Sequence, residues 1–144
     1  MEINLDFDGT CVTHEFPKVG KDIGAVPVLK ELVANGHNLI LFTMRSDVEN
    51  PKSDNPDIIP IAGNYLTDAV NWFKENDIPL YGIQTNPTQH TWTTSPKSYA
   101  QIMIDDSALG CPLSYDAKGV FSTRPFVDWV RVRYLLVQLG CLPA

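Results

Sequence analysis

Acidic side chains gather at the ends of two apolar segments of the chain. They are Asp6 and Asp8, in and directly after segment 3–7, and Asp105 and Asp106, directly after segment 101–104. Carboxylates held close together in a buried site raise one another's pKa unless a cation neutralises them. Magnesium is the hard, oxygen-seeking ion that suits such a set. The acids therefore predict a Mg²⁺ site.

A metal-bound aspartate with a second carboxylate two residues away is suited to phosphoryl transfer. An oxygen of Asp6 can attack phosphorus in line and form an aspartyl phosphate. Asp8 can protonate the leaving group and later deprotonate the attacking water. Thr43 offers a hydroxyl donor to a phosphoryl oxygen, and Lys97 offers a fixed positive charge. These residues predict phosphoryl transfer through an aspartyl phosphate.

Apolar periodicity predicts the elements that must position these side chains. Strands are expected at 3–7, 39–43, 80–83 and 101–104, with a weaker one near 120–121, and helices at 22–35, 65–74 and 125–139. Gly36 and Gly140 are placed to end the first and last helix, and Thr123 could cap the start of the last. Alternating strands and helices predict an α/β fold, a single domain over residues 1–144 with a doubly wound parallel sheet.

Two connections are long for a compact domain, at residues 46–63 and 84–96. Both follow the carboxyl ends of predicted strands, and ligands bind at that edge of an open α/β sheet. Long loops without regular structure are usually functional or disordered. We therefore expect a ligand to bind at this edge of the sheet.

The composition excludes several classes of protein. Its 144 residues contain 17 acidic and 11 basic side chains, a net charge of −6, which gives no general footprint for nucleic acid. The three cysteines form no CxxC pair, so neither a disulfide framework nor a zinc site is indicated. No apolar run approaches the roughly 20 residues of a membrane span. A cytoplasmic protein is expected.

Four segments together resemble the motifs of the haloacid dehalogenase-like superfamily. Segment 6–10, Asp-Phe-Asp-Gly-Thr, resembles the first motif, and Thr43 at the end of the next strand resembles the second. Lys97, leading into a strand that ends on the acids at 105–106, resembles the third and fourth. The resemblance covers residues 6 to 106, in the family's order. It implies a Rossmann-like core with strand order 5-4-1-2-3.

The resemblance also implies a role for each acid. Asp6 would be the nucleophile, and Asp8 the acid/base that also offers its backbone carbonyl to Mg²⁺. Asp106 would bind the metal directly, and Asp105 would contact a metal ligand instead of the metal. The opposite assignment of these two residues stays open. The second Asp of the first motif separates the family's phosphatases from its dehalogenases.

The lengths of the connections resemble those of uncapped members of the family. About a dozen residues separate Gly9 from the first helix, enough for a flap hairpin, and segment 84–96 is short for a folded cap. Arg45 resembles an arginine of uncapped phosphatases that act on polynucleotide ends, where it would grip the substrate phosphate bidentately together with Thr43 and Lys97.

Several residues and the substrate keep more than one interpretation. His14 is expected to be a solvated loop residue and Trp92 to pin its loop to the core, although His14 could touch substrate and Trp92, like His90, could stack on a ring. Lys18, Lys21 and Lys118 are alternatives to Lys97. A small or nucleotide-like phosphomonoester is slightly favoured over a polynucleotide end or a phosphoprotein. A receiver-like phosphoacceptor or a non-catalytic relative is a remote alternative, and the sequence leaves monomer and homo-oligomer undetermined.

Overall fold

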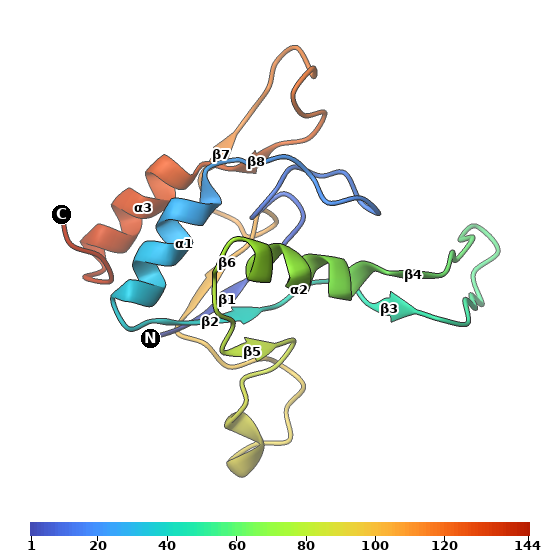
Figure 1. The fold of residues 1–144 in the computed structure, drawn as a ribbon, viewed down its shortest axis with the longest axis horizontal. Coiled ribbons are helices and arrows are strands. Elements are labelled where there is room, and N and C mark those ends of the chain that lie inside the picture. The colour runs from blue at the N-terminus through green and yellow to red at the C-terminus, as the bar shows by residue number, and fades with distance from the viewer.

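Four parallel strands form the central sheet in the computed structural model, which describes residues 1–144. They are β1 (Glu2–Leu5), β2 (Asn38–Leu41), β5 (Gly82–Ile83) and β6 (Ile102–Ile104). Their order is β5-β2-β1-β6, and every pairing is parallel (Figure 1). The predicted single-domain α/β fold with a parallel sheet is confirmed.

The strand order agrees with the expected 5-4-1-2-3 over the four strands present. From the β6 edge the core strands run fourth, first, second and third in chain order. The fifth strand, expected near Val120 and Phe121, is not formed, and both residues are exposed. The carboxylate of Asp116 accepts hydrogen bonds from the backbone N–H groups of Lys118, Phe121 and Ser122, so this segment folds into turns instead of pairing.

The chain forms three α-helices: α1 (Ala25–Ala34), α2 (Tyr65–Glu75) and α3 (Trp129–Gln138). As predicted, Gly36 and Gly140 follow α1 and α3 in left-handed conformations, with φ of 84° and 77°. The last helix starts later than predicted. Its cap is Asp128, which accepts the Arg131 N–H at 3.2 Å, and not Thr123. The residues just before it form β8 (Phe126–Val127), which pairs with β7 (Leu113–Ser114).

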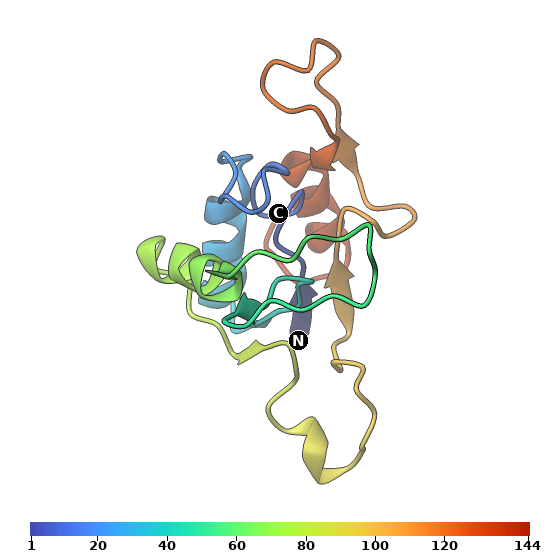
Figure 2. The same ribbon diagram turned by 90° about the vertical axis from the view of Figure 1, so that its right-hand side faces the viewer.

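The helices and the sheet share one core, on one face of the sheet. Side chains alternate along a strand, so Ile3 and Leu5 point into the cluster of 21 buried apolar residues to which all three helices contribute. Asn4 points to the other face, where it exchanges hydrogen bonds with Ser98. Figure 2 shows the three helices on one side of the strands and loop 84–101 extending from the other. The second face of the sheet is therefore covered by a loop, whereas a fully doubly wound sheet has helices on both faces.

Three long loops project from this core (Figure 1). The first, 49–62, joins the short antiparallel pair β3 (Asp47–Val48) and β4 (Gly63–Asn64). The second, 84–101, contains only the helical turn η1 (Gln89–Thr91), and the third joins β7 to β8. None holds an inserted cap domain. No helix of the chain has the length and apolar character needed to cross a membrane.

Candidate active site

The segment after β1 folds into a tight loop that fixes Asp6 at the carboxyl edge of the sheet. The Asp6 N–H bonds to the carbonyl of Ile104, which extends the pairing between β1 and β6 by one residue. The Phe7 carbonyl then accepts the N–H groups of Thr10 and Cys11 at 3.1 and 2.8 Å. The buried Phe7 side chain anchors the loop in the core. Asp6 therefore stands on a rigid element.

The carboxylates of Asp6, Asp105 and Asp106 converge as the sequence predicted, whereas the carboxylate of Asp8, which was predicted with them, is not in this group. Each of the three contributes one oxygen to a group whose members all lie within 4.8 Å of one another. The cause is topological, because β1 and β6 are parallel neighbours and their carboxyl ends meet at one edge. Three carboxylate oxygens at this separation are a donor set that fits Mg²⁺.

Thr10 lies between the two strand ends and was not among the predicted site residues. Its hydroxyl donates to Asp6 Oδ2 at 2.8 Å and accepts the Asp106 N–H at 3.1 Å. Its carbonyl accepts the indole N–H of Trp129, at the start of α3, at 2.7 Å. The only signal in the sequence was its position closing the motif that begins at Asp6.

Crowding of the acids changes their protonation. Burial, together with the nearby carboxylates of Asp106 and Asp105, raises the pKa of Asp6 to about 8, although the hydrogen bond from Thr10 opposes the rise. Burial also raises the pKa of Asp106, but hydrogen bonds from His14 and Asp6 outweigh it, so the net direction for Asp106 is downward. Without a cation, Asp6 therefore holds a proton near neutral pH.

His14 is not the solvated loop residue that was expected. Its Nε2 lies 2.7 Å from Asp106 Oδ2, and the two side chains are 15% and 14% exposed. The loop that carries it folds back over the acids, because the N–H of Thr13 bonds to the carbonyl of Lys21 and the hydroxyl of Thr13 accepts the Lys21 N–H. This return could not be inferred from local sequence pattern.

Asp8 forms a two-bond ion pair with Arg45. Arg45 Nε donates to Asp8 Oδ2 and Nη2 to Oδ1, both at 2.8 Å. The remaining N–H groups of Arg45 donate to the carbonyls of Pro17, Lys18 and Tyr65. Arg45 therefore joins three segments of the chain, and a contact with a phosphate would require one of these bonds to be given up. The phosphate-binding role of Arg45 stays a prediction.

Thr43 lies just beyond β2 and is held by its neighbours with its hydroxyl hydrogen free to donate. Its Oγ1 accepts the Arg45 N–H at 3.1 Å. Gln84 brackets its backbone, accepting the Thr43 N–H at 2.9 Å and donating to the Thr43 carbonyl at 2.7 Å. Gln84 has a positive φ of 66°, which is uncommon for a residue other than glycine. Sequence reasoning missed Gln84.

Lys97 is not brought into an ion pair with the acids. Its ammonium lies within 4.0 Å of no carboxylate, and its side chain is exposed. The next residue, Ser98, bonds to Asn4, whose side chain leaves β1 on the same face as Asp6 two residues later. The segment carrying Lys97 thus crosses the face of the sheet from which Asp6 projects. Its phosphate-binding role stays a prediction.

Trp92 does not pin its loop to the core, in contrast to the expectation. It is 61% exposed and packs edge-on against Tyr99, with the ring centroids 5.3 Å apart. Both rings line a hollow of about 350 Å³ that Lys97 also lines. An aromatic surface is therefore open to solvent beside a lysine.

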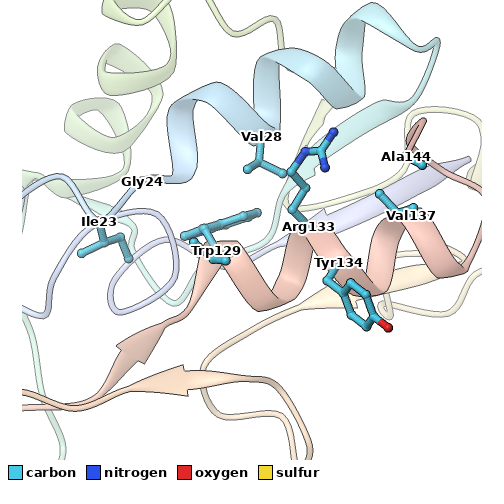
Figure 3. A pocket seen from close by; sticks show the side chains of 9 residues that line it. Ile23, Gly24, Val28, Trp129, Arg133, Tyr134, Val137 and Ala144 are labelled. Carbon is cyan, nitrogen blue, oxygen red and sulfur yellow. The ribbon is translucent and has the colours of Figure 1, made fainter.

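A larger hollow, of about 580 Å³, lies between α1 and α3 (Figure 3). Its lining is mainly apolar and consists of Ile23, Gly24, Val28, Trp129, Val130, Arg133, Tyr134, Val137 and Ala144. The one charged side chain, Arg133, already forms two hydrogen bonds with the carboxylate of Glu31. None of the converging acids lines this hollow, and we place the candidate site at the acids.

Comparisons with known proteins add support for the fold. No protein-family model and no curated protein matches the chain. A solved structure, described as that of a conserved protein from Bacteroides thetaiotaomicron, is 27% identical to it. The match covers 97% of this chain and 91% of that one, with a TM-score of 0.66. The chain is thus similar along nearly its whole length to a protein whose description names no activity.

Proposed function

We propose that this protein is a Mg²⁺-dependent phosphatase that forms an aspartyl phosphate on Asp6. The observation that carries the proposal is the convergence of the Asp6, Asp105 and Asp106 carboxylates at the carboxyl edge of the sheet. The resemblance of four segments to motifs of the haloacid dehalogenase-like superfamily supports the same chemistry.

The nucleophile in this proposal is one oxygen of the Asp6 carboxylate. It attacks phosphorus, the bond from phosphorus to the leaving oxygen breaks, and water then cleaves the acyl phosphate to restore Asp6. Burial and the neighbouring carboxylates raise the pKa of Asp6 in the metal-free protein, so a bound cation would favour the ionised form that attacks. Asp6, Asp105, Asp106 and the backbone carbonyl of Asp8 would hold a Mg²⁺ ion, which supplies positive charge to the acids and the phosphoryl oxygens.

Asp8 is the acid/base residue of the proposal. It donates a proton to the leaving oxygen and removes one from the attacking water. Its pairing with Arg45 fixes the carboxylate, so proton transfer requires one oxygen to loosen its bond to the guanidinium. Thr43 and Lys97 donate to the phosphoryl oxygens, Thr43 through the hydroxyl hydrogen left free by its neighbours.

The favoured substrate is a small or nucleotide-like phosphomonoester. The exposed rings of Trp92 and Tyr99 beside Lys97 offer a stacking surface and a cation to such a molecule. A polynucleotide end is less favoured, because the guanidinium of Arg45, which suggested it, is engaged within the protein. Binding that weakens steeply with added salt would reverse this preference.

The test is hydrolysis of para-nitrophenyl phosphate with Mg²⁺ and with chelator, for wild type and Asp6→Asn. Mg²⁺-dependent release that is lost in the variant supports the proposal. Release that survives in Asp6→Asn, or the lack of any release by folded wild type with this substrate and a panel of nucleotides, contradicts it.

A further inference from the structure

We infer that His14 is a positioning residue, which holds the carboxylate of Asp106 in place to bind a divalent metal ion. The inference rests on the proposed function for the presence of that ion. It begins from the short contact between His14 Nε2 and Asp106 Oδ2, 2.7 Å long and largely removed from solvent.

The two oxygens of Asp106 have different surroundings. Oδ2 contacts the imidazole, and Oδ1 lies 3.4 Å from the hydroxyl of Thr10. The backbone N–H of Asp106 also bonds to that hydroxyl, at 3.1 Å. Because Thr10 donates its one hydroxyl proton to Asp6, it holds the backbone of Asp106 and not the carboxylate. His14 therefore makes the closest side-chain contact that orients this carboxylate.

Gly9 provides an independent sign that this contact is built into the fold. It has a φ of 81°, and a Cβ atom at this position would overlap the His14 ring and Asp106 Oδ2. Only a residue without a side chain lets the ring and the carboxylate meet here. The loop is therefore shaped around the contact between His14 and Asp106.

His14 is outside the set of metal-binding groups itself. The group of ligand atoms that lie within 4.8 Å of one another consists of three carboxylates and includes no histidine. A hydrogen-bond partner that orients a ligand changes metal affinity by about 10- to 100-fold when it is removed. The same range is expected here, because without His14 the carboxylate must be ordered when the ion binds.

The experiment measures Mg²⁺ binding to the substrate-free protein by isothermal titration calorimetry. The variants are His14→Ala, His14→Gln, which keeps an N–H donor, and His90→Ala, which removes an exposed histidine of η1. Thermal unfolding in chelator checks the fold of each. His14→Ala should bind Mg²⁺ about 10- to 100-fold more weakly, His14→Gln should recover much of the loss, and His90→Ala should match wild type.

A second readout separates positioning from a merely structural role. The Mg²⁺ concentration for half-maximal hydrolysis should rise in His14→Ala by the factor seen in binding, while kcat at saturating Mg²⁺ stays close to wild type. Equal Mg²⁺ affinity in wild type and His14→Ala overturns the inference and leaves the proposed function intact. Binding that depends on His14 without any hydrolysis supports the inference and contradicts the proposed function. Wild type that binds no Mg²⁺ overturns both.

Discussion

Arg45 donates two hydrogen bonds of 2.8 Å to Asp8 from a position where its own side chain is only 1% exposed. Its guanidinium also lies over the rings of Phe7 and Phe16, 5.1 and 5.2 Å from their centroids. A charge so far removed from water is stable only while its partners stay in place. This pair therefore links the proposed acid/base residue to the stability of the fold.

Replacing Arg45 should destabilise the folded protein. Arg45→Ala leaves Asp8 without its partner and should lower the free energy of unfolding by about 3–5 kcal/mol. Arg45→Lys should recover only part of the loss, because an ammonium cannot make the paired bonds of the guanidinium fork. Urea unfolding measures both. Arg131→Ala is the control, because Arg131 is 71% exposed in its pair with Asp128. This substitution should lower the free energy of unfolding by at most about 1 kcal/mol. Equal losses at the two sites would contradict this account.

Asp8→Asn should affect substrates unequally. Nitrophenolate leaves without help from an acid, whereas an alkoxide needs a proton. The variant should therefore form the intermediate nearly normally from para-nitrophenyl phosphate and poorly from an alkyl phosphate, which rapid-quench kinetics can compare. Equal slowing with both substrates would show that Asp8 is not the general acid.

Gly9→Ala should damage the metal site as well as the backbone. Gly36→Ala is a matched control, because Gly36 has a φ of 84° but no atom within 4 Å of where a methyl group would lie. That variant should therefore lose only the stability that a side chain costs at positive φ, about 1–2 kcal/mol. The methyl group added by Gly9→Ala would also displace His14 or Asp106. Weakened Mg²⁺ binding is expected in Gly9→Ala and not in Gly36→Ala. Unchanged binding in Gly9→Ala would contradict the packing described here.

The contribution of Asp47 to stability should depend on pH. Hydrogen bonds from the hydroxyl and the backbone N–H of Thr67, in the first turn of α2, lower the pKa of Asp47 below its ordinary value of about 3.9. This contribution is present above the ordinary value and is lost as the pH falls through the lower, folded-state pKa. Asp47→Ala should therefore lower Tm at pH 7, by an amount that shrinks below about pH 4.

The control for Asp47 is Asp54→Ala, in the loop that follows β3. Asp54 makes no side-chain hydrogen bond, and its removal should leave Tm unchanged at either pH. A Tm difference for Asp47→Ala that is independent of pH would mean that the charge of Asp47 does not act through Thr67.

The parts of the site that depend on topology could be predicted from the sequence. Apolar segments gave the parallel strands, and parallel strands bring Asp6 and Asp106 to one edge whatever the details of the loops. The start of α3 was placed too early because β8 pairs with β7, a contact between segments far apart in the chain that periodicity does not reveal.

The parts that depend on long-range contacts could not be predicted. The contacts of Arg45 with the carbonyls of Lys18 and Tyr65 were not predicted, because no local pattern connects these residues to it. His14 was expected in solvent because its partner, Asp106, is 92 residues away. Both residues belong to contacts that form only when the loop after β1 folds back.

The central claim is that phosphate is transferred to Asp6, and trapping the intermediate tests it most directly. Asp8→Asn, expected to be slow in activating water, is incubated with para-nitrophenyl phosphate and Mg²⁺, quenched in acid and reduced with borohydride, which converts an aspartyl phosphate to homoserine. Peptide mass spectrometry then locates the change. Homoserine at position 6, formed with Mg²⁺ and not with chelator, is the predicted result. Turnover of the substrate with homoserine at another aspartate, or with none at any, would contradict the account.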